Sequence, residues 1–176
     1  SVGVPSNFGN FTIGLRFSLG QVNDYRRIIL FDAADDQGMY AFNGVFRAIT
    51  GSFPQGGTIS ANTTVDFVLT RSSSGLRPVT GYQIDSSGPT PVATPIFNFD
   101  DTSNFFVSTG NVTQFFRDNT GGTEYSSSGT VSLIKIWNEP LSAGEIPYAM
   151  VPEPATVALL AVAGGGAMLY LHRRRR

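Results

Sequence analysis

The sequence predicts an all-β antiparallel sandwich followed by one membrane-spanning helix. Apolar and polar residues alternate over short segments, and the alternation is complete at residues 11–19. Glycine (20 residues) and phenylalanine (14 residues) are frequent, which favours strands and turns over helices. Residues 155–171 carry no charge and are followed by four arginines near the end of the chain. The first two observations predict the sandwich, and the third predicts the helix.

The expected strands follow one another with turns between them. In residues 11–19, one face is apolar and comprises Phe11, Ile13, Leu15, Phe17 and Leu19. Asn43-Gly44 is the strongest short hairpin signal, and it separates the strands expected at 39–42 and 45–49. Strands are expected at 26–31, 39–42, 45–49, 64–71, 79–84, 104–107, 113–117 and 130–137, with a proline-rich loop at 88–95. Many short strands with glycine-rich turns indicate two packed antiparallel sheets.

The end of the domain carries one helix signal. Ser142 and Glu145 have the spacing of a capping box, and Pro147 limits the helix to a single turn. We expect a domain over residues 1–146, a short extended linker over 147–151 that continues from Ile146, and a separate tail over 152–176.

Composition excludes several functions. Without the tail arginines and Glu153, residues 1–151 contain 8 basic and 12 acidic residues, a net charge of −4 against −1 for the whole chain. This acidic balance argues against nucleic-acid binding. The absence of cysteine excludes disulfides and thiolate metal sites. The only histidine, His172, lies in the tail, so residues 1–151 cannot form a Ser-His-Asp triad or a histidine zinc site.

The tail has the pattern of a short membrane segment. As a helix, residues 155–171 would span roughly 25 Å, just under the ~30 Å hydrocarbon core. A basic cluster stays on the cytoplasmic side, so the N-terminal domain should lie outside the membrane. Gly164-Gly165-Gly166 weakens the helix and favours a transient anchor. The basic cluster comprises Arg173, Arg174, Arg175 and Arg176.

Pro152-Glu153-Pro154, the apolar segment and the arginine cluster together resemble the PEP-CTERM sorting signal of Gram-negative bacteria. The resemblance covers the whole tail. It implies that a membrane transpeptidase, exosortase, recognises the tail and processes it near the triplet. It also implies export, transient residence in the inner membrane with the C-terminus in the cytoplasm, and final delivery to the cell surface or an exopolysaccharide matrix. Such proteins begin with a signal peptide. This sequence begins at Ser1 and its start shows no charged segment followed by an apolar one, so we expect that the N-terminus has been trimmed or that the chain is a fragment.

Residues 11–146 resemble the laminin-G-like branch of the concanavalin A-type jelly rolls. The most specific segment is GTVSLIKIW at 129–137, followed by LSAGEI at 141–146. FTIGLRF at 11–17, VDFVLTR at 65–71 and GYQID at 81–85 resemble further strands of that family. The resemblance implies a jelly-roll sandwich and, by analogy of fold, carbohydrate binding. The opening strands of that family would lie before Phe11, and their absence would leave one sheet edge open to pairing.

An enzyme is the least favoured of three functions. Glycosidases need two carboxylates about 5–9.5 Å apart. The glucanase pattern E-x-D-x-x-E, found among concanavalin A-like folds, does not occur, and Glu124, Glu139 and Glu145 all lie in loops or turns. We therefore expect a non-catalytic, surface-sorted module that binds carbohydrate. A structural matrix protein without a specific ligand remains the second hypothesis, and a divergent polysaccharide-active enzyme remains the third.

Calcium is the metal that this composition could bind, because calcium takes carboxylate and carbonyl oxygens. The candidate ligands are Asp100, Asp101, Asp118 and Glu124. A second acidic turn contains Asp32, Asp35 and Asp36. None has the spacing of an EF-hand, and aspartates also begin and cap turns.

Adjacent phenylalanines offer candidate sugar contacts. Phe105-Phe106 and Phe115-Phe116 each place one ring on either side of an expected strand. One ring of each pair should enter the core, and the other could pack under a loop or stack on a sugar ring. Trp137 ends an alternating strand and is expected in the core or at its rim.

Overall fold

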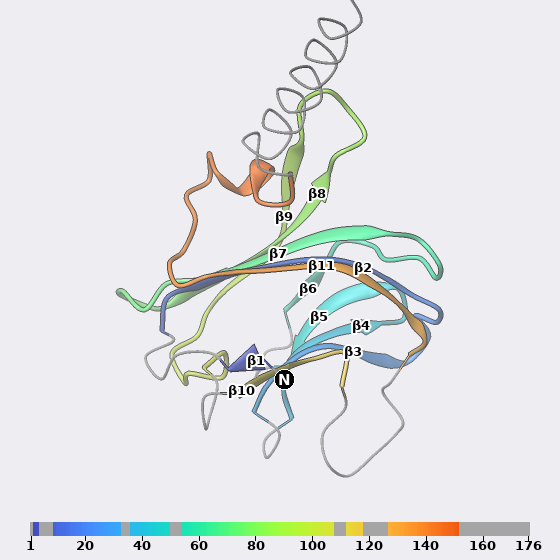
Figure 1. Ribbon diagram of the computed structural model, residues 1–176. Coiled ribbons are helices and arrows are strands. Elements are labelled where there is room, and N and C mark those ends of the chain that lie inside the picture. The colour runs from blue at the N-terminus through green and yellow to red at the C-terminus, as the bar shows by residue number, and fades with distance from the viewer. Residues whose placement is uncertain are drawn as a thin grey trace, which may run out of the picture.

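A computed structural model describes residues 2–3, 9–32, 36–49, 54–107, 112–117 and 127–151 of the 176-residue chain. The described residues form two antiparallel sheets packed face to face, drawn as the upper and lower layers of the body in Figure 1. Every strand pair is antiparallel. The predicted all-β sandwich is confirmed, and its two-sheet arrangement is consistent with the expected jelly roll.

The lower sheet has six strands in the order β1-β10-β3-β4-β5-β6. They are β1 (Val2–Gly3), β3 (Tyr25–Asp32), β4 (Gln37–Phe42), β5 (Val45–Ile49), β6 (Gln55–Gly56) and β10 (Val112–Phe115). The upper sheet has five strands in the order β11-β2-β7-β8-β9. They are β2 (Phe11–Leu19), β7 (Val65–Arg71), β8 (Pro78–Asp85), β9 (Val92–Asp100) and β11 (Gly129–Trp137).

Aromatic rings fill the space between the sheets. The five apolar residues of β2 expected on one face are all buried. Phe46 of the lower sheet stacks on Phe67 of the upper sheet with ring centroids 4.8 Å apart, and Phe17 meets Phe46 edge-on at 6.5 Å. Such pairs add to the burial of apolar area that stabilises the sandwich.

The Asn43-Gly44 turn sets the register of the β4–β5 hairpin. Both residues have positive φ, 50° and 79°, as a two-residue hairpin turn requires. Phe42 therefore pairs with Val45, and Tyr40 with Arg47. The expected strand boundaries at 39–42 and 45–49 agree with the structure to within two residues.

Two expectations between residues 88 and 107 are wrong. The expected loop at 88–95 ends at residue 91, because Val92 begins the nine-residue strand β9. Pro95 fits this strand because β9 is the edge of its sheet, where a missing N–H is tolerated. The expected strand at 104–107 is a turn, in which the Asp101 carboxylate accepts the backbone N–H groups of Phe105 and Phe106. These local bonds replace the ladder bonds that a strand would make.

Residues 146–151 are not extended, contrary to the expected linker. Ile146–Tyr148 form a 3-10 helix, η2, and Ile146, Ala149 and Met150 are buried. They pack on Val68, Ile84 and Trp137 on the outer face of the upper sheet. We call residues 141–151 the C-terminal cover. Because the cover lies on one face and the core on the other, all seven residues of β7 are buried.

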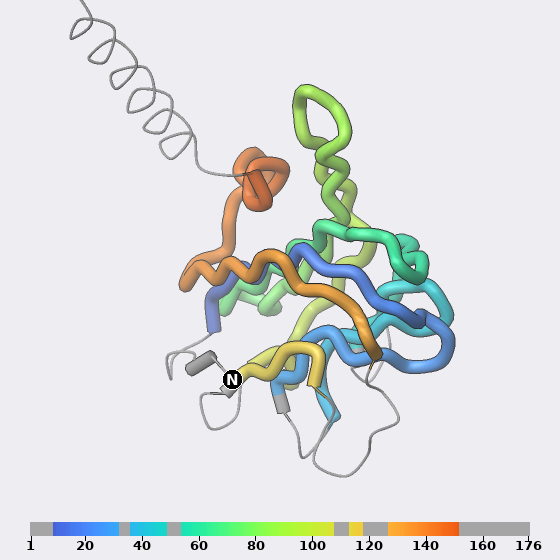
Figure 2. The backbone as a smooth tube through the Cα atoms, turned by 45° about the vertical axis from the view of Figure 1, so that its right-hand side comes forward, coloured from blue at the N-terminus to red at the C-terminus, as the bar shows by residue number. Residues whose placement is uncertain are grey.

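The β8–β9 hairpin projects beyond the body of the sandwich, as Figure 2 shows in green, with η2 in orange on the same side. The tail at 152–176, including the expected transmembrane helix at 155–171, lies outside the described residues. Within the part of the chain that the structure describes, no helix is long and apolar enough to cross a membrane.

Candidate ligand-binding face

Two rungs of side chains cross the outer face of the lower sheet. Arg27 of β3 pairs with Tyr40 of β4, which pairs in turn with Arg47 of β5. The second rung lies two residues away on each strand and consists of Tyr25, Phe42 and Val45. Side chains two positions apart in a strand share a face, so both rungs lie on the side away from the core. We call these six residues the outer face of the lower sheet.

The aromatic rings of the two rungs contact one another. The Tyr25 and Phe42 rings lie 4.3 Å apart, and Tyr25 meets Tyr40 edge-on at 5.3 Å. The Arg47 guanidinium carbon lies 4.8 Å from the centre of the Phe42 ring and 5.6 Å from that of Tyr25. Its positive charge therefore lies within cation–π range of two rings.

Burial divides this face into a supporting part and an accessible part. Arg27 and Tyr40 are buried, and the Arg27 guanidinium lies 3.9 Å from the Tyr40 ring centre. Asp36 binds both: it pairs with the Arg27 guanidinium and accepts a 2.7 Å hydrogen bond from the Tyr40 hydroxyl. Tyr25, Phe42 and Arg47 are half-buried and retain accessible surface.

Chemically, the accessible part combines an apolar aromatic surface with a cation. Aromatic rings stack on flat apolar surfaces, and a guanidinium donates paired hydrogen bonds to a carboxylate or a similar anion. The Arg47 guanidinium lies over the half-buried Phe42 ring. The arrangement suits a ligand with an apolar face and an anionic group.

Sequence reasoning did not find these residues, although one signal was present. The two-residue turn at Asn43-Gly44 fixes which residues of β4 and β5 lie opposite one another. Alternation then places Tyr40, Phe42 and Arg47 on one face and the apolar residues on the other. The contribution of β3 could not be read in this way, because its pairing with β4 shifts register between Arg27 and Ile29.

The expected calcium ligands are not brought together by the described residues. Asp100 is exposed at the end of β9, whereas the neighbouring Asp101 is buried. Asp118 and Glu124 lie outside the described residues. In the described ranges, no group of three or more acidic or histidine side chains could hold a metal ion. Calcium binding by this protein stays a prediction.

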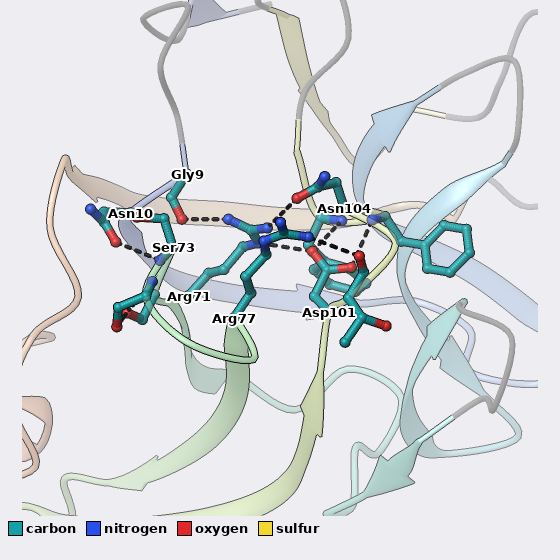
Figure 3. Close-up of polar contacts among 12 residues, drawn as sticks. Gly9, Asn10, Arg71, Ser73, Arg77, Asp101 and Asn104 are labelled. Atoms are coloured by element: carbon teal, nitrogen blue, oxygen red, sulfur yellow. Dashed lines mark hydrogen bonds and ion pairs between the residues drawn. The ribbon is translucent and has the colours of Figure 1, made fainter.

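Asp101 is the anchor of a buried polar network (Figure 3). Its Oδ2 accepts a 2.8 Å bond from Arg71 Nε and a 3.1 Å bond from the Phe106 N–H, and its Oδ1 accepts a 2.7 Å bond from the Phe105 N–H. The remaining Arg71 nitrogens bind the Gly9 carbonyl and Asn104 Oδ1. The pair ties the end of β7 to the loop after β9, and both oxygens of the Asp101 carboxylate accept hydrogen bonds from protein donors.

The paired phenylalanines belong to the main apolar core cluster or pack against it. Phe106 is buried, and Phe105, Phe115 and Phe116 pack against the core. Trp137 packs in the second apolar cluster beneath the C-terminal cover. The core and loop-packing interpretation of these aromatics is therefore correct.

A hollow of about 610 Å³ lies where the region after β6 meets β8 and β9. The Gln83 side chain crosses it, donating to the Thr58 carbonyl at 3.0 Å and accepting the Thr58 N–H at 3.5 Å. Asp85 borders it, and hydrogen bonds from Ser87 lower the pKa of this carboxyl. Its lining contains no aromatic ring, which makes it a weaker candidate for sugar stacking than the outer face of the lower sheet.

No protein-family model matches this sequence, and no curated protein matches it. One similar solved structure is the native heptameric SAP-like pentraxin from Limulus polyphemus, with a TM-score of 0.45 and 14% identity. The match covers 79% of this chain and 68% of the pentraxin chain. The fold class therefore rests on the strand pairing described above and not on this likeness.

Proposed function

We propose that this protein is a non-catalytic carbohydrate-binding module displayed on a cell surface or in an extracellular matrix. The observation that carries the proposal is the Tyr25–Phe42 ring pair, which is half-buried and has Arg47 above it. The rings would stack on the apolar face of a sugar, and Arg47 would bind an anionic substituent such as a uronate carboxylate. The favoured ligand is therefore an acidic polysaccharide.

In this proposal, the tail is the sorting signal that directs the domain to the cell surface. The uncharged segment at 155–171 would insert in the inner membrane, and the four arginines would stay in the cytoplasm. Exosortase would recognise Pro152-Glu153-Pro154 and release the domain to the surface. Support comes from the order of triplet, apolar segment and basic cluster. In an exosortase-bearing host, replacing Glu153 with Ala should keep the chain uncleaved in the membrane fraction; unchanged processing would exclude this role of the triplet.

Binding is tested with the full chain in detergent micelles on a glycan array that includes uronate-containing polysaccharides. We expect saturable binding, weakened at least about tenfold (~1.4 kcal/mol) by Phe42→Ala and by Arg47→Gln. Val131→Ala is the matched control, because Val131 is an exposed apolar residue on β11 of the other sheet. Thermal unfolding of each variant separates lost binding from lost folding.

The array also separates the rival functions. A properly folded protein that binds no glycan would favour the structural matrix protein. Release of reducing sugar from an acidic polysaccharide would favour the enzyme. Equal losses in Phe42→Ala and Val131→Ala would remove the outer face of the lower sheet as the binding site.

A further inference from the structure

We propose that the C-terminal cover, together with the neighbouring β8–β9 hairpin, lies against the phospholipid surface while the tail is inserted. This inference rests on the membrane insertion proposed above and adds which face of the domain meets the lipid. It follows from the position of Val151, where the described chain ends, and from the hydrogen bonds that fix this end to the upper sheet.

The end of the C-terminal cover, at Met150 and Val151, is hydrogen-bonded to two cationic side chains of the upper sheet. Arg16 donates a 3.3 Å hydrogen bond to the Met150 carbonyl, and Lys135 Nζ donates a 3.1 Å hydrogen bond to the Val151 carbonyl. Asp66 holds Arg16 in place with bonds of 2.6 and 2.7 Å. Consistent with this pairing, the hydrogen bond with Asp66 raises the pKa of Arg16.

The rest of the cover is anchored to the outer face of the upper sheet. The Thr12 hydroxyl donates to the Glu139 carbonyl at 2.9 Å and accepts the Leu141 N–H at 2.8 Å. The Met150 side chain is fully buried in the second apolar cluster. The domain is therefore bonded up to Val151, and only residues 152–154 separate it from the apolar segment.

This spacing brings the cover to the membrane. Four residue steps from Val151 to Ala155 reach at most about 14 Å when fully extended. The headgroup layer on one side of a bilayer is itself roughly 5–8 Å thick. A helix of roughly 25 Å falls just short of the ~30 Å hydrocarbon core, so its first residue must lie at or inside the edge of that core. The end of the cover at Val151 can therefore lie at most about 6–9 Å above the headgroup layer.

The surface at this exit suits the headgroup layer. Tyr148 of η2 is 56% exposed, and tyrosine is favoured at membrane–water interfaces. Val92 is 58% exposed and adjoins Ala93, which packs on the cluster beneath the cover. The exposed carboxylates Asp85 and Glu145 keep this face at headgroup level, because burying them in hydrocarbon is costly.

One consequence concerns the candidate ligand-binding face. The cover lies on the outer face of the upper sheet, while Tyr25, Phe42 and Arg47 lie on the outer face of the lower sheet. These are opposite sides of the sandwich (Figures 1 and 2). The membrane-apposed protein would therefore present its ligand-binding face away from the lipid.

The absence of native cysteine allows a direct test with single-cysteine variants of the full chain. A fluorophore is attached at Tyr148→Cys, at Val45→Cys on the opposite face, or at Leu160→Cys in the tail. The variants are reconstituted in vesicles of phosphatidylethanolamine and phosphatidylglycerol that carry headgroup or acyl-chain spin labels. We expect headgroup quenching at position 148 to be several-fold stronger than at position 45, and acyl-chain quenching at position 160.

Equal headgroup quenching at positions 148 and 45, with position 160 quenched, would overturn the orientation and leave membrane insertion intact. No quenching at position 160 would overturn insertion and the orientation together, and glycan binding could still hold. A Gly-Ser insertion of about ten residues after Val151, with a coil reach of roughly 16–19 Å, should relieve the quenching at position 148. Persistent quenching with the insertion would contradict control by the short connection.

Discussion

The Met150 side chain occupies the space that Gly14 leaves by having no side chain. A Cβ built on Gly14 would lie 2.7 Å from Met150 Sδ and 3.3 Å from a ring carbon of Trp137. Met150 belongs to the C-terminal cover and Gly14 to the second strand, β2, so this contact joins segments far apart in the chain. Because residue 14 is a glycine, the Met150 side chain can pack directly on β2.

We therefore expect Gly14→Ala to loosen the cover. The added methyl must displace the Met150 side chain or shift Trp137, and such overpacking costs about 1–3 kcal/mol. Urea unfolding and the fluorescence of Trp137, the only tryptophan, measure the effect. Gly144→Ala is the matched control, because nothing lies within 4 Å of a Cβ built there. Equal effects of the two substitutions would contradict the proposed contact.

The Arg71–Asp101 pair should be a main determinant of stability. Both side chains are buried, so Asp101→Asn leaves the Arg71 charge uncompensated at a cost of about 3–5 kcal/mol. Asp100→Asn serves as the control, since Asp100 is the exposed neighbour. Chemical unfolding of the two variants gives the comparison. A loss below about 1 kcal/mol for Asp101→Asn would show that water reaches the pair.

Calcium should not alter the effect of Asp101→Asn, because three protein donors already occupy the Asp101 oxygens. We expect the fall in melting temperature caused by this substitution to be the same in calcium and in chelator. A larger fall in calcium would make Asp101 a calcium ligand. A calcium response that is lost in Asp118→Asn or Glu124→Gln would instead place the ion at those residues.

The cover should weaken in acid through Glu145. The hydrogen bond from the Ser142 hydroxyl, and then that from the Ser142 N–H, lower the pKa of Glu145 below its ordinary value of 4.5. A carboxyl with a lowered folded pKa contributes stability that is complete above the ordinary value and is lost as the pH falls through the folded pKa. Trp137 fluorescence should therefore change below about pH 4.5. In Glu145→Gln this component should be absent; an unchanged profile would exclude Glu145 as its source.

The local sequence pattern was sufficient to predict a strand where one face of that strand packs on the core. The alternation in β2 and the Asn43-Gly44 turn predicted their elements because burial and turn geometry depend on adjacent residues. Local pattern failed at β9, where Pro95 indicated a loop. Whether a proline fits a strand depends on whether that strand is an edge, and strand order is a property of the whole sheet.

The candidate ligand-binding face also has a part that local pattern could predict and a part that it could not. Alternation beside the hairpin turn could have placed Tyr40, Phe42 and Arg47 on one face, but Tyr25 joins them only through a pairing that shifts register. The sequence also placed Asp101 among candidate metal ligands. Its pairing with Arg71, 30 positions earlier, depends on how the end of β7 meets the loop after β9.

By itself, the sequence determined the all-β class, the register of one hairpin, and the uncharged segment and basic cluster of the tail, since each depends on residues close together in the chain. The tertiary structure decided which aromatics are buried, that Asp101 pairs with Arg71, and that residues 146–151 belong to the C-terminal cover instead of forming an extended linker. Those outcomes depend on contacts between distant segments, such as Met150 on Gly14, which no local pattern contains.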